Sequence, residues 1–141
     1  MIQEMSATAR LQEGLRFEVE ASSGHFVVLD HVEHVGDKSR GFSPMEMLLV
    51  GLAGCTGMSV LSILRKRRQE VTGYELHVHG KRTSEHPQVF VEISVEHRIT
   101  GQHVRPELVA RAIELSEQRY CGVEAMLGKT ARLSHVYKIV E

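Results

Sequence analysis

The stretch SPMEMLLVGLAGCT, residues 43–56, decides the fold of this chain. Ser43 can cap a helix, Pro44 suits the first helical position, and Glu46 lies three residues after the cap, which makes a capping box. The residues that follow Glu46 are apolar or small on every side, a pattern typical of a buried helix. Four consecutive cations that end at Arg68 complement the negative end of the helix dipole. We therefore predict a long buried helix from Ser43 to about Arg68.

This helix carries an unusual number of glycines for its length. Gly51, Gly54 and Gly57 all fall inside it, and glycine is costly in a helix interior. We therefore expect another segment to approach the helix closely at these positions.

The residues before the helix alternate in the manner of a small sheet. Residues 8–20 read as a hairpin that turns at Glu13-Gly14, and Ser22-Ser23-Gly24 predicts a second turn. A third strand should run from His25 to Leu29. The polar residues 31–40 that follow predict a loop.

The residues after the helix predict more strands and two further helices. Alternation predicts one strand around residues 74–79 and another around 89–99, each buried on one face. A second helix should begin near Pro106 and run to about Tyr120. A short helical segment, residues 122–127, and a last strand, residues 131–140, complete the chain. This order predicts a single α+β domain, 1–141, with helices on one face of an antiparallel sheet.

Composition narrows the classes of function. The 141 residues carry a net charge of −1, which argues against a general nucleic-acid binder. The N-terminus lacks the pattern of a secretory signal, and the longest apolar run, residues 47–53, is far shorter than the ~20 residues that a membrane helix needs. We expect a soluble protein of the reducing cytoplasm, with no membrane or nucleic-acid partner.

The two cysteines, Cys55 and Cys121, are the best candidates for chemistry. Cys55 lies in the middle of the predicted buried helix, where a cysteine can also be an inert small hydrophobe. Cys121 lies between two predicted helices, where unpaired backbone N–H groups can stabilise a thiolate and the neighbouring Gly122 permits access. The alternative for Cys121 is a packing residue at a helix junction. In a reducing compartment the two cysteines are free thiols or a working redox pair.

No cluster of cysteine and histidine has the spacing of a structural zinc site, so we expect no metal. His77 and His79 share one face of a predicted strand, but no third ligand follows at suitable spacing. A solvated strand face is the simpler interpretation of this pair.

Three segments of the chain resemble the OsmC/Ohr family, most closely its YhfA-like branch. They are residues 43–49 (SPMEMLL), residues 51–56 (GLAGCT) and residues 120–123 (YCGV). The resemblance extends over nearly the whole chain. It implies an intertwined homodimer in which antiparallel sheets wrap around long central helices.

The resemblance also implies an activity. Characterised members of the family are thiol-dependent peroxidases that prefer organic hydroperoxides and serve in oxidative-stress defence. Cys55 would attack the peroxide and become a sulfenic acid, and Cys121 would resolve it into a disulfide. An external dithiol would then reduce this disulfide, so no bound cofactor is expected. A nearby second thiol makes chemical sense because it traps the sulfenic acid before over-oxidation.

Two positions depart from the pattern of the peroxidases. His25 stands where the family places an arginine that holds the thiolate, and Met45 stands where it places a glutamate, with Glu46 one residue later. His25 could help to hold a thiolate if protonated, or it could be a surface histidine. Nine residues at ~100° each put Glu46 about opposite Cys55 on the helix, which favours its role as the capping-box partner.

These departures leave two other functions open. The chain could be a binding protein whose apolar dimer cleft holds a lipid or another small molecule, with the cysteines only lining it. It could also be a redox sensor whose disulfide alters an interaction with a partner. Dimerisation fits the sequence in each case, because a helix so uniformly apolar needs more cover than one chain of this size provides.

Overall fold

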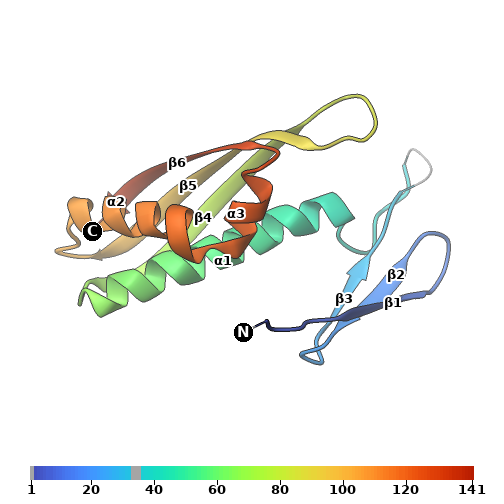
Figure 1. Cartoon of the computed structure of the whole chain (residues 1–141), viewed down its shortest axis with the longest axis horizontal. Helices are drawn as coiled ribbons and strands as arrows, with labels where there is room; N and C mark the ends of the chain where they lie inside the picture. Colours follow the sequence, from blue (N-terminus) through green and yellow to red (C-terminus); the bar gives the residue numbers. More distant parts are fainter. Residues whose placement is uncertain (1, 33–35) are drawn as a thin grey trace. The chain divides into compact units, whose positions relative to one another are not determined.

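The computed structural model describes residues 2–32 and 36–141. The chain divides into two compact units, Met1–Leu48 and Leu49–Glu141, and each is described by itself. The α+β class is confirmed: the chain forms two three-stranded sheets and a set of helices (Figure 1).

The first unit contains the predicted three-stranded antiparallel sheet. Strands β1 (Ala7–Leu11), β2 (Phe17–Ala21) and β3 (Phe26–Leu29) pair in chain order. The first turn includes Gly14, whose φ of 59° suits a residue without a side chain. Of the predicted loop 31–40, residues 33–35 lie outside the described residues, and the others form neither helix nor strand.

Helix α1 (Pro44–Lys66) begins at the predicted capping box. The backbone N–H of Glu46 donates to Ser43 Oγ at 3.1 Å, and the backbone N–H of Ser43 donates to Glu46 Oε1 at 2.8 Å. The two residues therefore satisfy each other's backbone donors, and the predicted start of the helix is confirmed.

The prediction that this helix is buried on every side is wrong for the chain by itself. Only a stripe at every fourth residue is buried, namely Leu52, Thr56, Val60 and Leu64. Val50 is 44% exposed and Met58 is 76% exposed. The reason is geometric, since one sheet and its helices cover one side of a helix and leave the other open. By length and composition alone α1 could also cross a membrane, a test that core helices of soluble proteins pass as well.

The glycines of α1 divide in the same way. A side chain at Gly57 would meet the side chain of Leu76 at 3.1 Å, so the predicted close approach is confirmed there. At Gly51 and Gly54 a β-carbon would meet nothing within 4 Å. These two positions face open space in the described part of the chain.

The second unit is built on a mixed sheet with the order β4-β5-β6. Strands β4 (Glu70–Arg82) and β5 (Phe90–Gln102) form a long antiparallel pair. Strand β6 (Arg132–Val140) lies parallel to β5, which differs from the antiparallel pairing that we predicted. The helical connection between them, residues 103–131, carries the chain back to the end at which β5 began, and such a crossover makes the next strand parallel.

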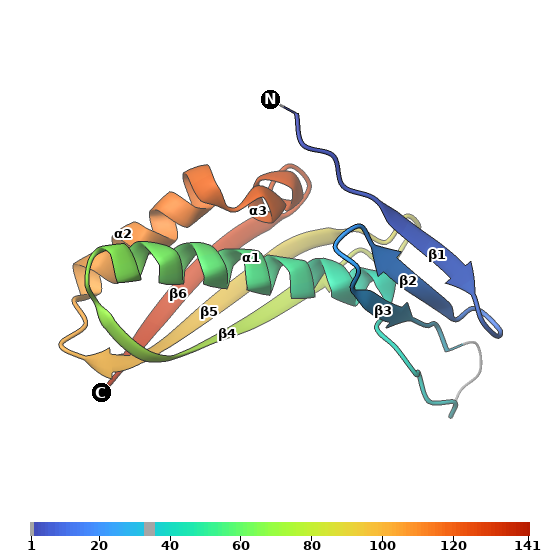
Figure 2. The ribbon, with the colours of Figure 1, turned by 90° about the horizontal axis from the view of Figure 1, so that it is seen from below.

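That connection matches the predicted helices closely. Helix α2 (Pro106–Leu115) continues into a π-helical turn, η1 (Ser116–Tyr120), and α3 (Gly122–Leu127) follows after Cys121. Figures 1 and 2 show α1, α2 and α3 on one face of the β4-β5-β6 sheet.

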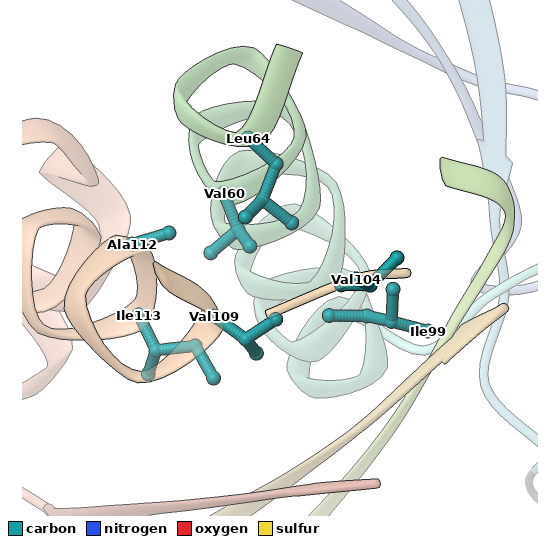
Figure 3. Close-up of a cluster of buried hydrophobic side chains, with 7 residues drawn as sticks. All are labelled: Val60, Leu64, Ile99, Val104, Val109, Ala112 and Ile113. Carbon is teal, nitrogen blue, oxygen red and sulfur yellow. The ribbon is translucent and has the colours of Figure 1, made fainter. Parts of the chain in front are cut away.

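An apolar cluster fills the space between α1, α2 and β5 (Figure 3). Its seven buried members are Val60, Leu64, Ile99, Val104, Val109, Ala112 and Ile113. Burying a side chain such as Leu64 contributes about 1.5–3 kcal/mol to stability. The apolar cluster therefore fixes the register between the helices and the sheet, and this register also positions the polar residues farther along the same elements.

Candidate functional site

Cys121 occupies the short break between η1 and α3. Its backbone is extended, with φ −90° and ψ 100°, so it acts as the N-cap of α3. Its sulfur accepts a hydrogen bond from the backbone N–H of Glu124 at 3.4 Å, as the sequence predicted for a thiol at a helix start. The side chain is only 2% exposed, so the predicted access through Gly122 is wrong in this chain.

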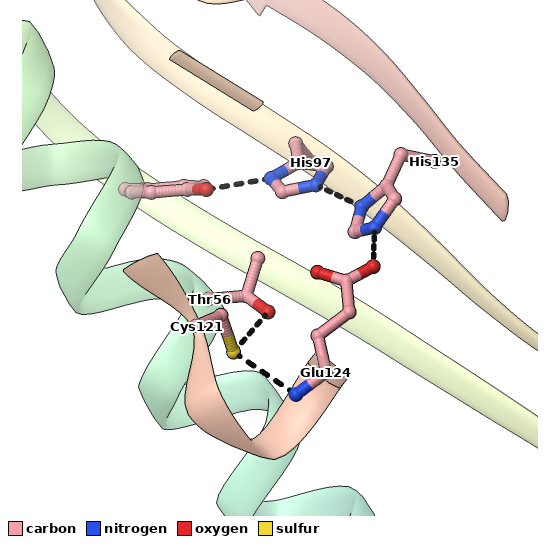
Figure 4. Close-up of polar contacts among 6 residues, drawn as sticks. Thr56, His97, Cys121, Glu124 and His135 are labelled. Carbon is pink, nitrogen blue, oxygen red and sulfur yellow. Dashed lines mark hydrogen bonds and ion pairs between the residues drawn. The ribbon is translucent and has the colours of Figure 1, made fainter. Parts of the chain in front are cut away.

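Helix α1 brings the second thiol to the same place. Thr56 is fully buried, and its Oγ1 lies 3.6 Å from Cys121 Sγ (Figure 4). Cys55, the residue before it, is half-buried, and both cysteines are free thiols. The structure therefore brings together the two residues that the sequence singled out, although they are far apart in the chain. Their redox role stays a prediction.

The surroundings of Cys121 raise the pKa of its thiol above the ordinary value of 9.0. Burial is the largest cause, because a thiolate loses its hydration, and the neighbouring Cys55 side chain is the next. Hydrogen bonds from the Glu124 backbone and from Thr56 act in the opposite direction but do not cancel the rise. At neutral pH Cys121 is therefore a protonated thiol, and it must lose this proton before it can act as a nucleophile.

A chain of hydrogen bonds lies beside the thiols, and we call its four members, Tyr74, His97, His135 and Glu124, the polar network. Tyr74 Oη is 2.6 Å from His97 Nδ1, and His97 Nε2 is 3.0 Å from His135 Nδ1. His135 Nε2 is in turn 2.5 Å from Glu124 Oε1 (Figure 4). His97 and Glu124 are buried, with 0% and 3% of their surfaces exposed.

Burial sets the protonation of two members of this network, His97 and Tyr74. Desolvation, and then the charge of His135, lower the pKa of His97 from 6.5 to about 4, so its ring is neutral at pH 7. Desolvation also raises the pKa of Tyr74, which keeps its hydroxyl protonated. A neutral imidazole donates through one ring nitrogen and accepts through the other. When Glu124 is ionised, every hydrogen-bond donor of the polar network then points toward its carboxylate.

One oxygen of this carboxylate has no partner within the protein. Glu124 Oε2 and Ser116 Oγ are buried without a hydrogen bond in the described residues. A buried polar atom without a partner is costly, so each such atom calls for an explanation. In Figure 4 the free oxygen of Glu124 points away from His135 and toward the side on which Thr56 lies.

Glu117 adds a second carboxylate near this place. Glu117, Glu124 and His135 each offer a ligand atom, and these atoms lie within 4.8 Å of one another. Such a set could in principle hold a divalent cation, which the sequence did not predict. His135 Nε2 and Glu124 Oε1 already bond to each other, however, and Glu117 is exposed. The contacts are those of a hydrogen-bonded pair with a carboxylate nearby.

The other two predicted site residues belong to the first unit. His25 is exposed, and its Nδ1 lies 2.9 Å from Ser23 Oγ. Glu46 is the capping-box partner of Ser43, as predicted. Whether either residue orients a thiolate stays a prediction. His77 and His79 are both exposed, which confirms the solvated strand face.

Sequence reasoning missed the polar network. A signal was present, because His97 has the same parity as the inward-facing Ile93, Val95 and Ile99 of β5. His135 likewise alternates in step with the inward-facing Leu133 and Ile139 of β6. A histidine in an inward position of two neighbouring strands could have been recognised, but their pairing depends on the parallel register, in which Val95 is opposite His135.

Comparisons with known proteins agree with this architecture. Residues 36–135 match the family model described as OsmC-like protein. The chain is 39% identical over 136 residues to Protein YhfA of Escherichia coli strain K12, covering 96% of this chain and 98% of that protein. It is similar to a hypothetical protein of Aquifex aeolicus VF5, with a TM-score of 0.84 at 29% identity, covering 99% and 100% of the two chains.

A more distant likeness extends to an organic hydroperoxide resistance protein from Elizabethkingia anophelis. Its TM-score is 0.76 at 14% identity, and the alignment covers 99% of each chain, which shows a shared fold. The family model covers well over half of this chain, and the identity to YhfA spans nearly all of it. This chain therefore belongs to the OsmC-like protein family.

Proposed function

We propose that this protein is a thiol-dependent peroxidase that reduces organic hydroperoxides through Cys55 and Cys121. The observation that carries the proposal is the position of the two thiols. Cys121 has a hydrogen bond with Thr56, and its neighbour Cys55 helps to raise the pKa of its thiol. The shared fold with a protein named for organic hydroperoxide resistance supports the class of substrate. We place the reaction in the cytoplasm, where dithiol reductants maintain free thiols.

The reaction would proceed in three balanced steps. The Cys55 thiolate attacks the outer oxygen of the hydroperoxide, the O–O bond breaks, and the alkoxide takes up a proton to leave as an alcohol. Cys121 then attacks the sulfur of the Cys55 sulfenic acid, which forms the disulfide and releases water. An external dithiol reduces this disulfide by exchange and becomes a disulfide itself.

The division of labour between the thiols follows from their surroundings. Cys55 is half-buried, so a peroxide can approach it, whereas Cys121 is buried and protonated. The more accessible thiol therefore meets the substrate first, and the buried thiol meets only the sulfenic acid beside it.

We also propose that the working form is a homodimer. The open side of α1 presents Val50 and Met58 to solvent, with Gly51 and Gly54 free of contacts. Exposed apolar surface on a long helix is typical of an interface, and glycines allow a second helix to approach closely. Size-exclusion chromatography with light scattering should give twice the mass of 15.8 kDa, and a monomer would contradict this part of the proposal.

One observation favours a different function. A groove of about 530 Å³ lies along α1 and is lined by Met58, Ile63, Leu115 and Tyr120 among others, but by neither cysteine. It suits a small apolar molecule. In a binding protein of this kind, native mass spectrometry would show a retained ligand and the thiols would not react with peroxide.

Catalytic turnover of a hydroperoxide tests the proposed function. Wild-type protein should consume cumene hydroperoxide continuously when dithiothreitol is supplied, and Cys55→Ser should abolish this consumption. Ser62→Ala, a matched change on the same helix within the groove, should leave it unchanged. Rapid oxidation without turnover would indicate a redox sensor, and no reaction of either thiol would indicate the binding protein.

A further inference from the structure

Formation of the disulfide requires that the Cys121 thiol give up its proton to an acceptor. Cys121 must become a thiolate to attack the Cys55 sulfenic acid, yet it is buried and protonated. Its sulfur has hydrogen bonds to Thr56 Oγ1 and to the Glu124 backbone N–H, and the Cys55 side chain lies next to it. The N–H can stabilise a thiolate but cannot take its proton. A proton acceptor is therefore needed within reach of this pair.

The Glu124 side chain meets this need. The hydrogen bond from its own backbone to Cys121 Sγ ties the position of Glu124 to the thiol. Its Oε1 is held by His135, while its Oε2 is buried and has no partner in the described residues. Figure 4 shows this free oxygen directed to the side of Thr56, the other group that contacts the thiol. A carboxylate oxygen that has no hydrogen-bond partner, close to a buried thiol that must lose its proton, is suited to general-base catalysis.

The hydrogen bonds of the other members of the polar network are consistent with Glu124 as the proton acceptor. With Glu124 ionised, Tyr74 would donate to His97, His97 to His135, and His135 to the carboxylate, so all donors of the polar network would point to Glu124. The titratable groups that face Glu124 are His135 from β6, Glu117 from η1 and Cys121. None of these is a permanent cation that would hold the carboxylate in a fixed ion pair.

We propose that Glu124 accepts the proton of Cys121 during disulfide closure, and this inference rests on the proposed function. The proton passes through the Thr56 hydroxyl, directly or over one water molecule, to Glu124 Oε2. The Cys121 thiolate then forms the S–S bond, the S–O bond of the sulfenic acid breaks, and the leaving hydroxide recovers the proton from Glu124 as water. Glu124 ends the step ionised, as it began.

The test separates the two oxidation steps. Wild-type protein and Glu124→Gln are mixed with one equivalent of cumene hydroperoxide, and Cys55 sulfenic acid is trapped with dimedone while the disulfide is followed by mass spectrometry. Glutamine keeps the length of the side chain and can still accept from His135. We expect sulfenic acid to form at the wild-type rate, with disulfide closure slowed about tenfold or more.

The pH profile distinguishes a base from a structural residue. The slowing of disulfide closure in Glu124→Gln should become smaller as the pH rises from about 7 to about 9.5, because the fraction of Cys121 that loses its proton without help then increases. Thr56→Val should show the same behaviour to a smaller degree, and Glu114→Gln, an exposed glutamate paired with Arg111, should behave like the wild type.

Three results would overturn the inference. One is disulfide closure by Glu124→Gln at the wild-type rate, and another is a deficit that is the same at every pH. The third is slowing of the wild type by a metal chelator, which would assign Glu117, Glu124 and His135 to a cation instead. If wild-type Cys55 forms no sulfenic acid at all, the proposed function itself fails and this inference with it.

Discussion

The second unit contains two unlike regions, the apolar cluster and the polar network with its thiols, and α1 and β5 contribute residues to both. On α1 the buried stripe changes from Val60 to Thr56 within one helical turn, and on β5 it changes from Ile99 to His97 in two residues. On the helical connection, Ile113 gives way to Ser116. One packed layer therefore provides stability at one end and a place for chemistry at the other.

The comparison explains why the polar network can exist in a buried place. A hydrogen-bonded chain of phenol, imidazoles and carboxylate is stable in a low dielectric only if its members are held in position. Tyr74 packs against the apolar cluster with its ring and bonds His97 with its hydroxyl, so it joins the two regions. We expect changes in the apolar cluster to affect stability most, and changes around the thiols to affect reactivity more than stability.

The largest effect should follow from a cavity in the apolar cluster. Leu64→Ala removes a fully buried side chain and should lower the free energy of unfolding by about 2–5 kcal/mol. Urea unfolding followed by circular dichroism measures this change. Met126→Ala, at a position that is 75% exposed, should stay within about 0.5 kcal/mol of the wild type. A loss below about 1 kcal/mol for Leu64→Ala would mean that the cluster is loosely packed.

The next largest effect is a loss of stability in acid, which we attribute to His97 of the polar network. The native pKa of His97 is lowered to about 4, so between about pH 4 and 6.5 the unfolded chain binds a proton that the folded chain does not. Stability contributed by the neutral ring is thus fully present above about pH 6.5 and is lost as the pH falls toward 4, by up to about 3 kcal/mol. Urea unfolding at a series of pH values measures the slope.

A variant without His97 tests whether this residue causes the change of stability with pH. His97→Leu should be less stable than the wild type at pH 7, because Tyr74 and His135 lose a partner, but its stability should depend less on pH over the same interval. An unchanged pH dependence in this variant would show that other groups cause the acid sensitivity.

A pair of exchanges between valine and threonine tests the boundary between the two regions. Val60→Thr places a hydroxyl in the apolar cluster without a partner and should cost about 1–3 kcal/mol. Thr56→Val removes a hydroxyl whose contact with Cys121 is long, at 3.6 Å, and should cost less than about 1 kcal/mol. Thermal unfolding compares the two variants. Equal costs would contradict a sharp change of character along α1.

The smallest effect on stability, but a clear one on reactivity, concerns the two thiols. Iodoacetamide at neutral pH should label Cys55 at least about tenfold faster than Cys121, because Cys121 is buried and its pKa is raised. Each rate is measured by peptide mass spectrometry in the variant that lacks the other cysteine. Similar rates would show that burial does not protect Cys121.

Local signals in the sequence predicted much of this fold. The capping box of Ser43 and Glu46, the N-cap position of Cys121 and the bounds of α3 all depend on residues within one turn of each other, and all were confirmed. The parallel direction of β6 was missed because it depends on where a crossover returns the chain. Burial of α1 was overestimated because periodicity reports that a side chain is apolar, not whether the same chain covers it.

The candidate site was predictable only in part. Both cysteines stood out by residue type, whereas the polar network joins residues from β4, β5, α3 and β6 whose proximity depends on sheet register. His97 and Glu124 are polar residues in buried positions, and the alternation along β5 marks only His97 as facing inward. That the members of the polar network meet one another is found only when long-range pairing is known.

The most direct test of the account is the fate of the two thiols under a stoichiometric oxidant. Reduced protein is treated with one equivalent of cumene hydroperoxide, quenched with an alkylating reagent, and mapped by peptide mass spectrometry. We predict loss of both free thiols into a single Cys55–Cys121 disulfide, abolished by Cys55→Ser and replaced by a lasting sulfenic acid in Cys121→Ser. Two intact thiols after excess hydroperoxide would contradict the account and turn attention to the groove along α1.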